Sequence, residues 1–219
     1  MNGSAIARPR RTVACGFAAI LLAGSGAFGI ADVQSQEPIQ ASLTTPSSVL
    51  APFSLVDQRG RPVTDKNFRG SFMLVYFGYT YCPDVCPLGL QRISQVIEAL
   101  GAEGERIVPI FITVDPERDT GQVLAAYTSH FHPRLIGLTG RREQIDAAKR
   151  AYGVRSFKLF SPPSFDDESK VSDNSRYLMQ HSASTYLVNP DGRLESIFPH
   201  EIPPREMARQ IHERVVEYP

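Results

Sequence analysis

The sequence lacks an excess of charge of either sign, because 23 lysines and arginines balance 23 aspartates and glutamates among 219 residues. Three arginines and no acidic residue occur in residues 1–31, so the remainder carries 20 basic and 23 acidic side chains. Blocks of basic residues are absent as well. A slightly acidic body without such blocks argues against nucleic acid as a partner. The hydrophobic share of 42% is sufficient for one domain with a real core.

Cysteine is also scarce, with only Cys15, Cys82 and Cys86 in the chain. Cys15 lies in an apolar N-terminal run, which leaves two thiols for the rest of the protein. In an oxidising compartment, two thiols form either a disulfide or a set of metal ligands kept reduced by dedicated donors. A structural zinc site takes four ligands, and the missing third cysteine of the body argues against it.

The N-terminus has the basic-then-apolar order of an export signal. Arg8, Arg10 and Arg11 precede an uncharged run over residues 12–31. Without cleavage the run becomes a single membrane anchor with the arginines inside, and the arginine pair also permits a twin-arginine signal. We therefore predict that residues 1–31 are an export signal or a single membrane anchor. The folded body is then expected on the periplasmic side of the inner membrane.

A polar, proline-containing stretch at residues 32–50 is typical of a flexible tether, so the folded domain is expected at residues 51–219. This domain begins with a predicted hairpin, in which Phe53–Val56 and Pro62–Phe68 flank a turn at Asp57–Gly60.

A continuous apolar run at Phe72–Phe77 predicts a strand buried on both faces of a sheet. Helical spacing of apolar residues follows from Leu90 to Leu100, and Gly101 ends the helix. The further predicted elements are a strand at 107–114, a helix opened by a capping box of Asp119 and Gln122, a helix at 141–152, a hairpin of Thr185–Val188 and Leu194–Phe198, and a helix after Pro203 and Pro204. This order predicts an α/β fold with a central mixed sheet flanked by helices.

Cys82 and Cys86 follow the buried strand and precede its helix, which is where open α/β sheets place ligand sites. A helix N-terminus stabilises a thiolate through its free amides and its dipole. In a helical segment the Cys-x3-Cys spacing puts both sulfurs on one face, which suits chelation of copper(I) or zinc. A stabilising disulfide is the plain alternative, although so short a loop removes little chain entropy.

Histidine supplies the candidate third ligand, because His181 stands immediately before a predicted strand at Ser182–Val188. On spacing alone, a structural role for His181 is favoured over a ligand role. The other histidines are expected to be solvated, capping or loop residues: His130, His132, His200 and His212.

Four motifs occur in order: FGYTYCPDVCP at Phe77–Pro87, VDPERDT at Val114–Thr120, GLTG at Gly137–Gly140, and His181 followed by YLVNPDG to Gly192. Together they resemble the Sco/SenC family of copper-binding assembly factors for the binuclear copper centre of cytochrome c oxidase, over about residues 50 to 218. The resemblance implies a thioredoxin-like fold and an N-terminal membrane anchor. It also implies that Cys82, Cys86 and His181 bind copper.

Some positions depart from the family pattern. Gln180 replaces an aspartate that precedes the histidine in many relatives, and Tyr81 stands where histidine is frequent. The polar stretch at Ser156–Asn174 is long for a connection and predicts a functional or mobile loop.

Asp84, between the cysteines, is interpreted either as the N-cap of the helix or as a group that tunes the thiolates or engages the target. The acidic and basic residues of the second motif are assigned turn and capping roles: Asp115, Glu117, Arg118 and Asp119.

Three functions follow from this interpretation. The first is a copper metallochaperone, not itself an enzyme, that passes copper(I) or copper(II) to the copper-centre subunit of cytochrome c oxidase or to another copper acceptor. The second is a thiol–disulfide oxidoreductase that uses Cys82 and Cys86 as a redox pair, with a thiol reductant as partner, and keeps the acceptor's cysteines reduced. The third is a copper or redox sensor. A membrane contact through the N-terminal segment is expected in each case.

Overall fold

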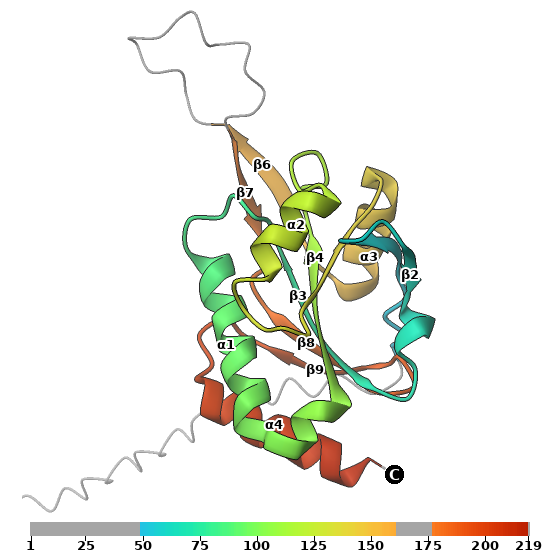
Figure 1. Ribbon diagram of the computed structural model, residues 1–219, viewed down its shortest axis with the longest axis vertical. Coiled ribbons are helices and arrows are strands. Elements are labelled where there is room, and N and C mark those ends of the chain that lie inside the picture. The colour runs from blue at the N-terminus through green and yellow to red at the C-terminus, as the bar shows by residue number, and fades with distance from the viewer. Residues whose placement is uncertain (1–48, 161–176, 219) are drawn as a thin grey trace, which may run out of the picture. The chain divides into compact units, whose positions relative to one another are not determined.

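The computed structural model describes residues 49–160 and 177–218, and it contains a seven-stranded mixed sheet in the order β2-β1-β5-β4-β3-β8-β9 (Figure 1). The parallel pairs are β3 with β4 and β4 with β5, and the other neighbours are antiparallel. The strands are β1 (Ser54–Asp57), β2 (Pro62–Thr64), β3 (Phe72–Gly78), β4 (Ile107–Thr113), β5 (Ile136–Thr139), β8 (Thr185–Val188) and β9 (Leu194–Phe198).

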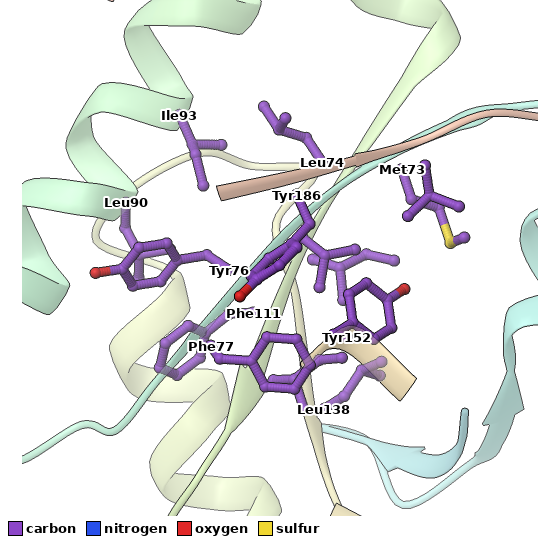
Figure 2. Packing of buried hydrophobic residues seen from close by; sticks show 14 of the residues in the cluster. Met73, Leu74, Tyr76, Phe77, Leu90, Ile93, Phe111, Leu138, Tyr152 and Tyr186 are labelled. Carbon is purple, nitrogen blue, oxygen red and sulfur yellow. The ribbon is translucent and has the colours of Figure 1, made fainter. Parts of the chain in front are cut away.

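Helices cover both faces of this sheet, as the alternation of side chains along β3 shows. The ring of Tyr76 packs against Gly89 of α1, whereas Phe77 lies 5.2 Å from Tyr152 of α3 between ring centroids (Figure 2). Every residue of β3 is buried, as the apolar run predicts. The helices are α1 (Val85–Leu100), α2 (Gly121–Thr128), α3 (Arg142–Tyr152) and α4 (Pro204–Glu217), with 3-10 turns η1 (Asp65–Phe68) and η2 (Gly101–Arg106).

The helix ends follow local chemistry. α3 ends at Gly153, whose left-handed φ of 68° suits glycine, and α4 begins with Pro204 in its first turn. The predicted cap of α2 is wrong. Thr120, rather than Asp119, caps this helix, because the Thr120 Oγ1 accepts a hydrogen bond from the Val123 N–H at 3.3 Å.

A separate two-stranded ribbon consists of β6 (Ser156–Phe160) and β7 (Tyr177–His181), which pair antiparallel (Figure 1). The expectation of a loop from Ser156 to Asn174 is therefore wrong over its first five residues, and the rest of that stretch lies outside the described residues. His181 is the last residue of β7 rather than the residue before β8, because the next strand begins only at Thr185.

The predicted N-terminal hairpin is confirmed as β1 paired with β2, and the predicted α/β fold with a central mixed sheet is confirmed as well. The second strand of the hairpin, β2, is shorter than expected, because residues Asp65–Phe68 form the 3-10 turn η1. The expected export signal or anchor at residues 1–31 lies outside the described residues. Within the described ranges, no helix has the length and apolar character needed to cross a membrane.

Candidate metal centre

The structure brings together the three residues that the motifs single out. The sulfur atoms of Cys82 and Cys86 and a ring nitrogen of His181 all lie within 4.8 Å of one another. The Cys86 Sγ is 3.2 Å from the His181 Nε2. Both cysteines are free thiols, so the predicted alternative of a disulfide does not describe this state. The side chain of Cys86 is fully buried, whereas Cys82 is 9% exposed at the rim.

The carboxyl end of β3 forms the floor of the site and requires glycine there. A Cβ atom on Gly78 would lie 2.8 Å from both the Cys86 Sγ and a ring carbon of Phe111. Such distances are below van der Waals contact, so any side chain at this position displaces the sulfur. The absent side chain of Gly78 therefore creates the space that Cys86 occupies.

The first turns of α1 are fixed in a similar way. The Tyr76 Oη donates a hydrogen bond to the Val85 carbonyl at 3.2 Å, and a Cβ atom on Gly89 would lie 2.7 Å from the Tyr76 ring. Asp84 occupies the N-cap position, but its side chain makes no capping hydrogen bond. The capping interpretation of this side chain is therefore wrong. The Asp84 backbone N–H instead forms a hydrogen bond with the Cys82 sulfur, which helps to lower the pKa of Cys82.

His181 reaches the sulfurs with a defined tautomer. Its Nδ1 lies 3.0 Å from the Ser182 carbonyl oxygen, and a carbonyl only accepts, so Nδ1 carries a proton. In the neutral ring, Nε2 is then the unprotonated nitrogen that faces Cys86. Edge-on contacts with the rings of Tyr76 and Tyr79, at centroid distances of 6.4 and 5.9 Å, fix the plane of the imidazole.

The side chains of Cys82 and Cys86 share a hydrogen bond that shifts their pKa values in opposite directions. Hydrogen bonding with Cys86 lowers the pKa of Cys82, and the bond with Cys82 raises the pKa of Cys86, which burial raises further. Because the two groups interact so closely, they titrate as a pair. The metal-free site therefore holds a thiolate at the accessible Cys82 and a thiol at the buried Cys86.

Asp119 is a buried residue behind the cysteines whose role the sequence did not reveal. Its carboxyl oxygens accept hydrogen bonds from the Thr80 N–H at 3.0 Å, from the Thr80 Oγ1 at 2.6 Å and from the Thr113 Oγ1 at 2.6 Å. Burial raises the pKa of Asp119 although these hydrogen bonds oppose the shift. Asp119 thus ties the segment that leads to Cys82 onto the end of β4.

Two of the other histidines have side-chain partners outside the cluster. The His132 Nδ1 accepts a hydrogen bond from the Arg134 N–H, and the His212 Nδ1 lies 2.6 Å from a Glu103 carboxylate oxygen. The carbonyl of His200 accepts a hydrogen bond from Arg92. In the described part of the chain, the Cys82, Cys86 and His181 cluster is the one group of three potential metal ligands.

The family SCO1/SenC matches residues 41–216. The chain belongs to this family. It is 43% identical over 142 residues to the mitochondrial SCO2 homologue of Mus musculus, with 64% of this chain and 52% of the relative covered. The chain spans about half the length of the mammalian SCO proteins that it matches.

Solved structures of the family agree with the fold. Arabidopsis thaliana ScoI with copper bound has a TM-score of 0.69 and 34% identity, over 78% of this chain and 100% of that chain. Bradyrhizobium japonicum ScoI with copper bound has a TM-score of 0.64 and 39% identity, over 77% and 99%. The predicted thioredoxin-like fold class is thereby confirmed.

Proposed function

We propose that the protein binds copper through Cys82, Cys86 and His181 and aids assembly of the binuclear copper centre of cytochrome c oxidase. The observation that carries the proposal is the placement of two sulfurs and one imidazole nitrogen within 4.8 Å of one another. The copper-bound relatives from Arabidopsis and Bradyrhizobium support it. The description of the Sco family as cytochrome c oxidase assembly proteins points the same way.

The donor set fits copper better than the common alternatives. Thiolates and imidazole are poor ligands for calcium and magnesium, which prefer oxygen. Structural zinc takes four ligands, and the described residues offer three in this cluster. A site with three protein ligands and Cys82 at its rim leaves a position for a ligand from the acceptor. Such a position is what transfer by ligand exchange requires.

Bound copper supplies a soft Lewis-acid centre that sulfur ligands of an acceptor can also coordinate. The protein supplies the sulfurs of Cys82 and Cys86 and a ring nitrogen of His181, and Cys86 loses its proton on binding. Because protons compete for all three ligands, the copper affinity is expected to fall as the pH decreases.

The test is a titration of the exported body with copper(I) and copper(II). A complex with one copper per chain and a sulfur-to-copper charge-transfer band with copper(II) are expected. The variants Cys82→Ser and Cys86→Ser should each lose affinity for both ions, and His181→Ala should lose affinity above all for copper(II). His212→Ala is the matched control, because its imidazole is paired with Glu103 away from the cluster. Absence of the one-copper complex would refute the proposal.

A thiol–disulfide oxidoreductase is the second candidate function, favoured by the unlinked, hydrogen-bonded pair of Cys82 and Cys86. Disulfide exchange begins with attack by a thiolate, and Cys82 is the more exposed thiol. His181 separates the two functions, because thiol exchange does not need an imidazole ligand. An His181→Ala variant that has lost copper binding but still supports oxidase assembly would favour the redox function, with a thiol reductant as the partner.

The location of the domain belongs to the same proposal. We propose that residues 1–31 export the chain or anchor it in the inner membrane, that residues 32–50 act as a tether, and that the copper-binding domain of residues 51–219 faces the periplasm. The arginines before an uncharged run in residues 1–31 support this placement. A fusion of alkaline phosphatase to the C-terminus should be active, and deletion of residues 1–31 should abolish its activity.

A further inference from the structure

The cysteines and His181 come from parts of the fold that share no strand pairing. Cys82 and Cys86 lie after β3 of the seven-stranded sheet, whereas His181 ends β7 of the two-stranded ribbon. Figure 1 shows this ribbon extending away from the main sheet. The register of the main sheet reaches the imidazole only through residues 182–184, which link β7 to β8, so it does not by itself fix the separation between the sulfurs and the imidazole. Side-chain contacts of the ribbon supply further restraints.

One short segment touches both sides of the site. This is the β4–α2 connection, defined here as residues 114–120. On the cysteine side, the Asp119 carboxylate of this connection accepts hydrogen bonds from the backbone N–H and the hydroxyl of Thr80, which lies two residues before Cys82. On the ribbon side, its Glu117 accepts a hydrogen bond from the Lys158 Nζ of β6 at 2.5 Å.

Arg118 of the β4–α2 connection makes the central contact with β7. Its Nη1 donates a hydrogen bond to the Tyr177 carbonyl at 3.0 Å, and its guanidinium carbon lies 3.7 Å from the centroid of the Tyr177 ring. Its Nε is 2.5 Å from the Asp115 Oδ2, and the Tyr177 Oη donates to the Asp115 Oδ1 at 2.6 Å. Arg118, Asp115 and Tyr177 thus close a ring of contacts in which each residue binds the other two.

Arg118 also faces the segment that leads to the cysteines. Its guanidinium carbon lies 4.8 Å from the Tyr81 ring centroid and 5.7 Å from the Tyr79 ring centroid. Tyr81 is adjacent to Cys82, and the Tyr79 ring contacts the His181 imidazole. The side chain of Arg118 is only 13% exposed. A planar, largely buried guanidinium therefore lies between the strand that carries the histidine and the segment that carries the cysteines.

We propose that Arg118 is a positioning residue that sets the distance between the His181 imidazole and the two sulfurs. The inference rests on the proposed copper site, and its consequence depends on the oxidation state of copper. Copper(I) is satisfied by soft thiolates, whereas copper(II) favours tetragonal coordination with nitrogen ligands. Loss of Arg118 is therefore expected to weaken copper(II) binding through His181 and to preserve copper(I) binding by Cys82 and Cys86.

The experiment compares Arg118→Gln and Arg118→Lys with the wild-type protein. For Arg118→Gln, copper(II) affinity should fall about 10–100-fold, as is typical when the partners that orient a metal-binding histidine are removed. The nitrogen hyperfine splitting in the copper(II) electron paramagnetic resonance spectrum should weaken, and copper(I) affinity in chelator competition should be retained. In the metal-free protein, the amides of β7 should exchange hydrogen faster. Arg118→Lys keeps the charge but not the forked donor, so it should give an intermediate result.

Arg134→Gln is the matched control. Arg134 also binds backbone carbonyls, those of Gly104 at 2.8 Å and Ile107 at 3.2 Å, but at the opposite end of β4. A copper(II) spectrum and a β7 exchange rate in Arg118→Gln equal to those of Arg134→Gln would overturn the inference. If Arg118→Gln does not fold, the same comparison with Arg118→Lys decides the question. Failure of the wild-type protein to bind copper refutes the proposed function instead, so the two failures are distinguishable.

Discussion

The cysteine side and the histidine side of the site are held by different means. Cys86 packs against the sheet itself, because its sulfur occupies the space over Gly78 beside Phe111. His181 ends a ribbon whose strands pair only with each other among the described residues. Polar and ring contacts hold this ribbon in place. The position of the Cys86 sulfur therefore depends on the packing of the core, whereas that of the imidazole depends on a few contacts that can open locally.

The outer face of the ribbon sharpens this contrast. Phe157, Leu159 and Leu178 are 57%, 44% and 47% exposed, although they are large and apolar. On the inner face, Tyr177 and Met179 are buried. The ribbon thus buries only part of one face, because Phe160, opposite Tyr177, is 61% exposed, and it gains less from apolar burial than β3 does.

The largest expected effect is on the core beneath the cysteines. Phe111→Ala removes a fully buried ring of β4 and should lower the free energy of unfolding by about 3–5 kcal/mol. Urea denaturation followed by circular dichroism measures it. Leu159→Ala, on the exposed ribbon face, is the control and should change the free energy far less. Equal losses in the two variants would contradict the proposed difference between core and ribbon.

A smaller loss is expected for Gly78→Ala, about 1–3 kcal/mol, because the added Cβ overpacks the floor of the site. The Cys86 sulfur must move, so copper(I) affinity should fall together with stability. Gly60→Ala is not a suitable control, because the φ of Gly60 is positive. Wild-type copper(I) affinity in Gly78→Ala would contradict this prediction, because the displaced Cys86 sulfur would then still bind copper normally.

Tyr177→Phe should act on the ribbon and barely on the core. The variant keeps the ring beneath Arg118 but loses the hydrogen bond to Asp115, so we expect a loss of about 1 kcal/mol. Hydrogen exchange should accelerate at the amides of β7 and remain unchanged at those of β3. Uniform acceleration over both strands would mean that the ribbon and the sheet open as one unit.

The smallest expected effect is a difference between Cys82 and Cys86 in their reactivity toward an alkylating agent at low pH, in the reduced, metal-free protein. Because the pKa of Cys82 is lowered, Cys82 is a thiolate at pH values at which an ordinary thiol is protonated. Because the pKa of Cys86 is raised, Cys86 stays protonated at pH values at which an ordinary thiol ionises. Iodoacetamide at about pH 6 should therefore modify Cys82 and spare Cys86. Peptide mapping by mass spectrometry measures this, and comparable labelling of both residues would contradict it.

The sequence predicted the elements that depend on local patterns. The apolar run of β3, the periodicity of α1 and the glycine after α1 each reflect neighbouring residues, and the structure confirms them. Asp119 was assigned to a cap because its local pattern fits one. Its partner Thr80 lies 39 residues away, so only the folded chain reveals the contact.

The ribbon escaped prediction for a similar reason. β6 was included in a polar, proline-containing stretch, and its pairing with β7 joins segments separated by residues 161–176. The candidate ligands were found by the motifs. The motifs did not show that Arg118 and Tyr177 connect His181 to the cysteines, because side-chain contacts between a connection and a distant strand leave no periodic pattern.

The complete burial of Cys86 gives the site a direction. Cys82 is the more exposed of the two cysteines, so an acceptor thiol that approaches from solvent is expected to meet Cys82 before Cys86. Disulfide exchange is therefore expected to begin at Cys82, with Cys86 as the second thiol. The different exposure of the two sulfurs thus gives the pair a defined order of reaction.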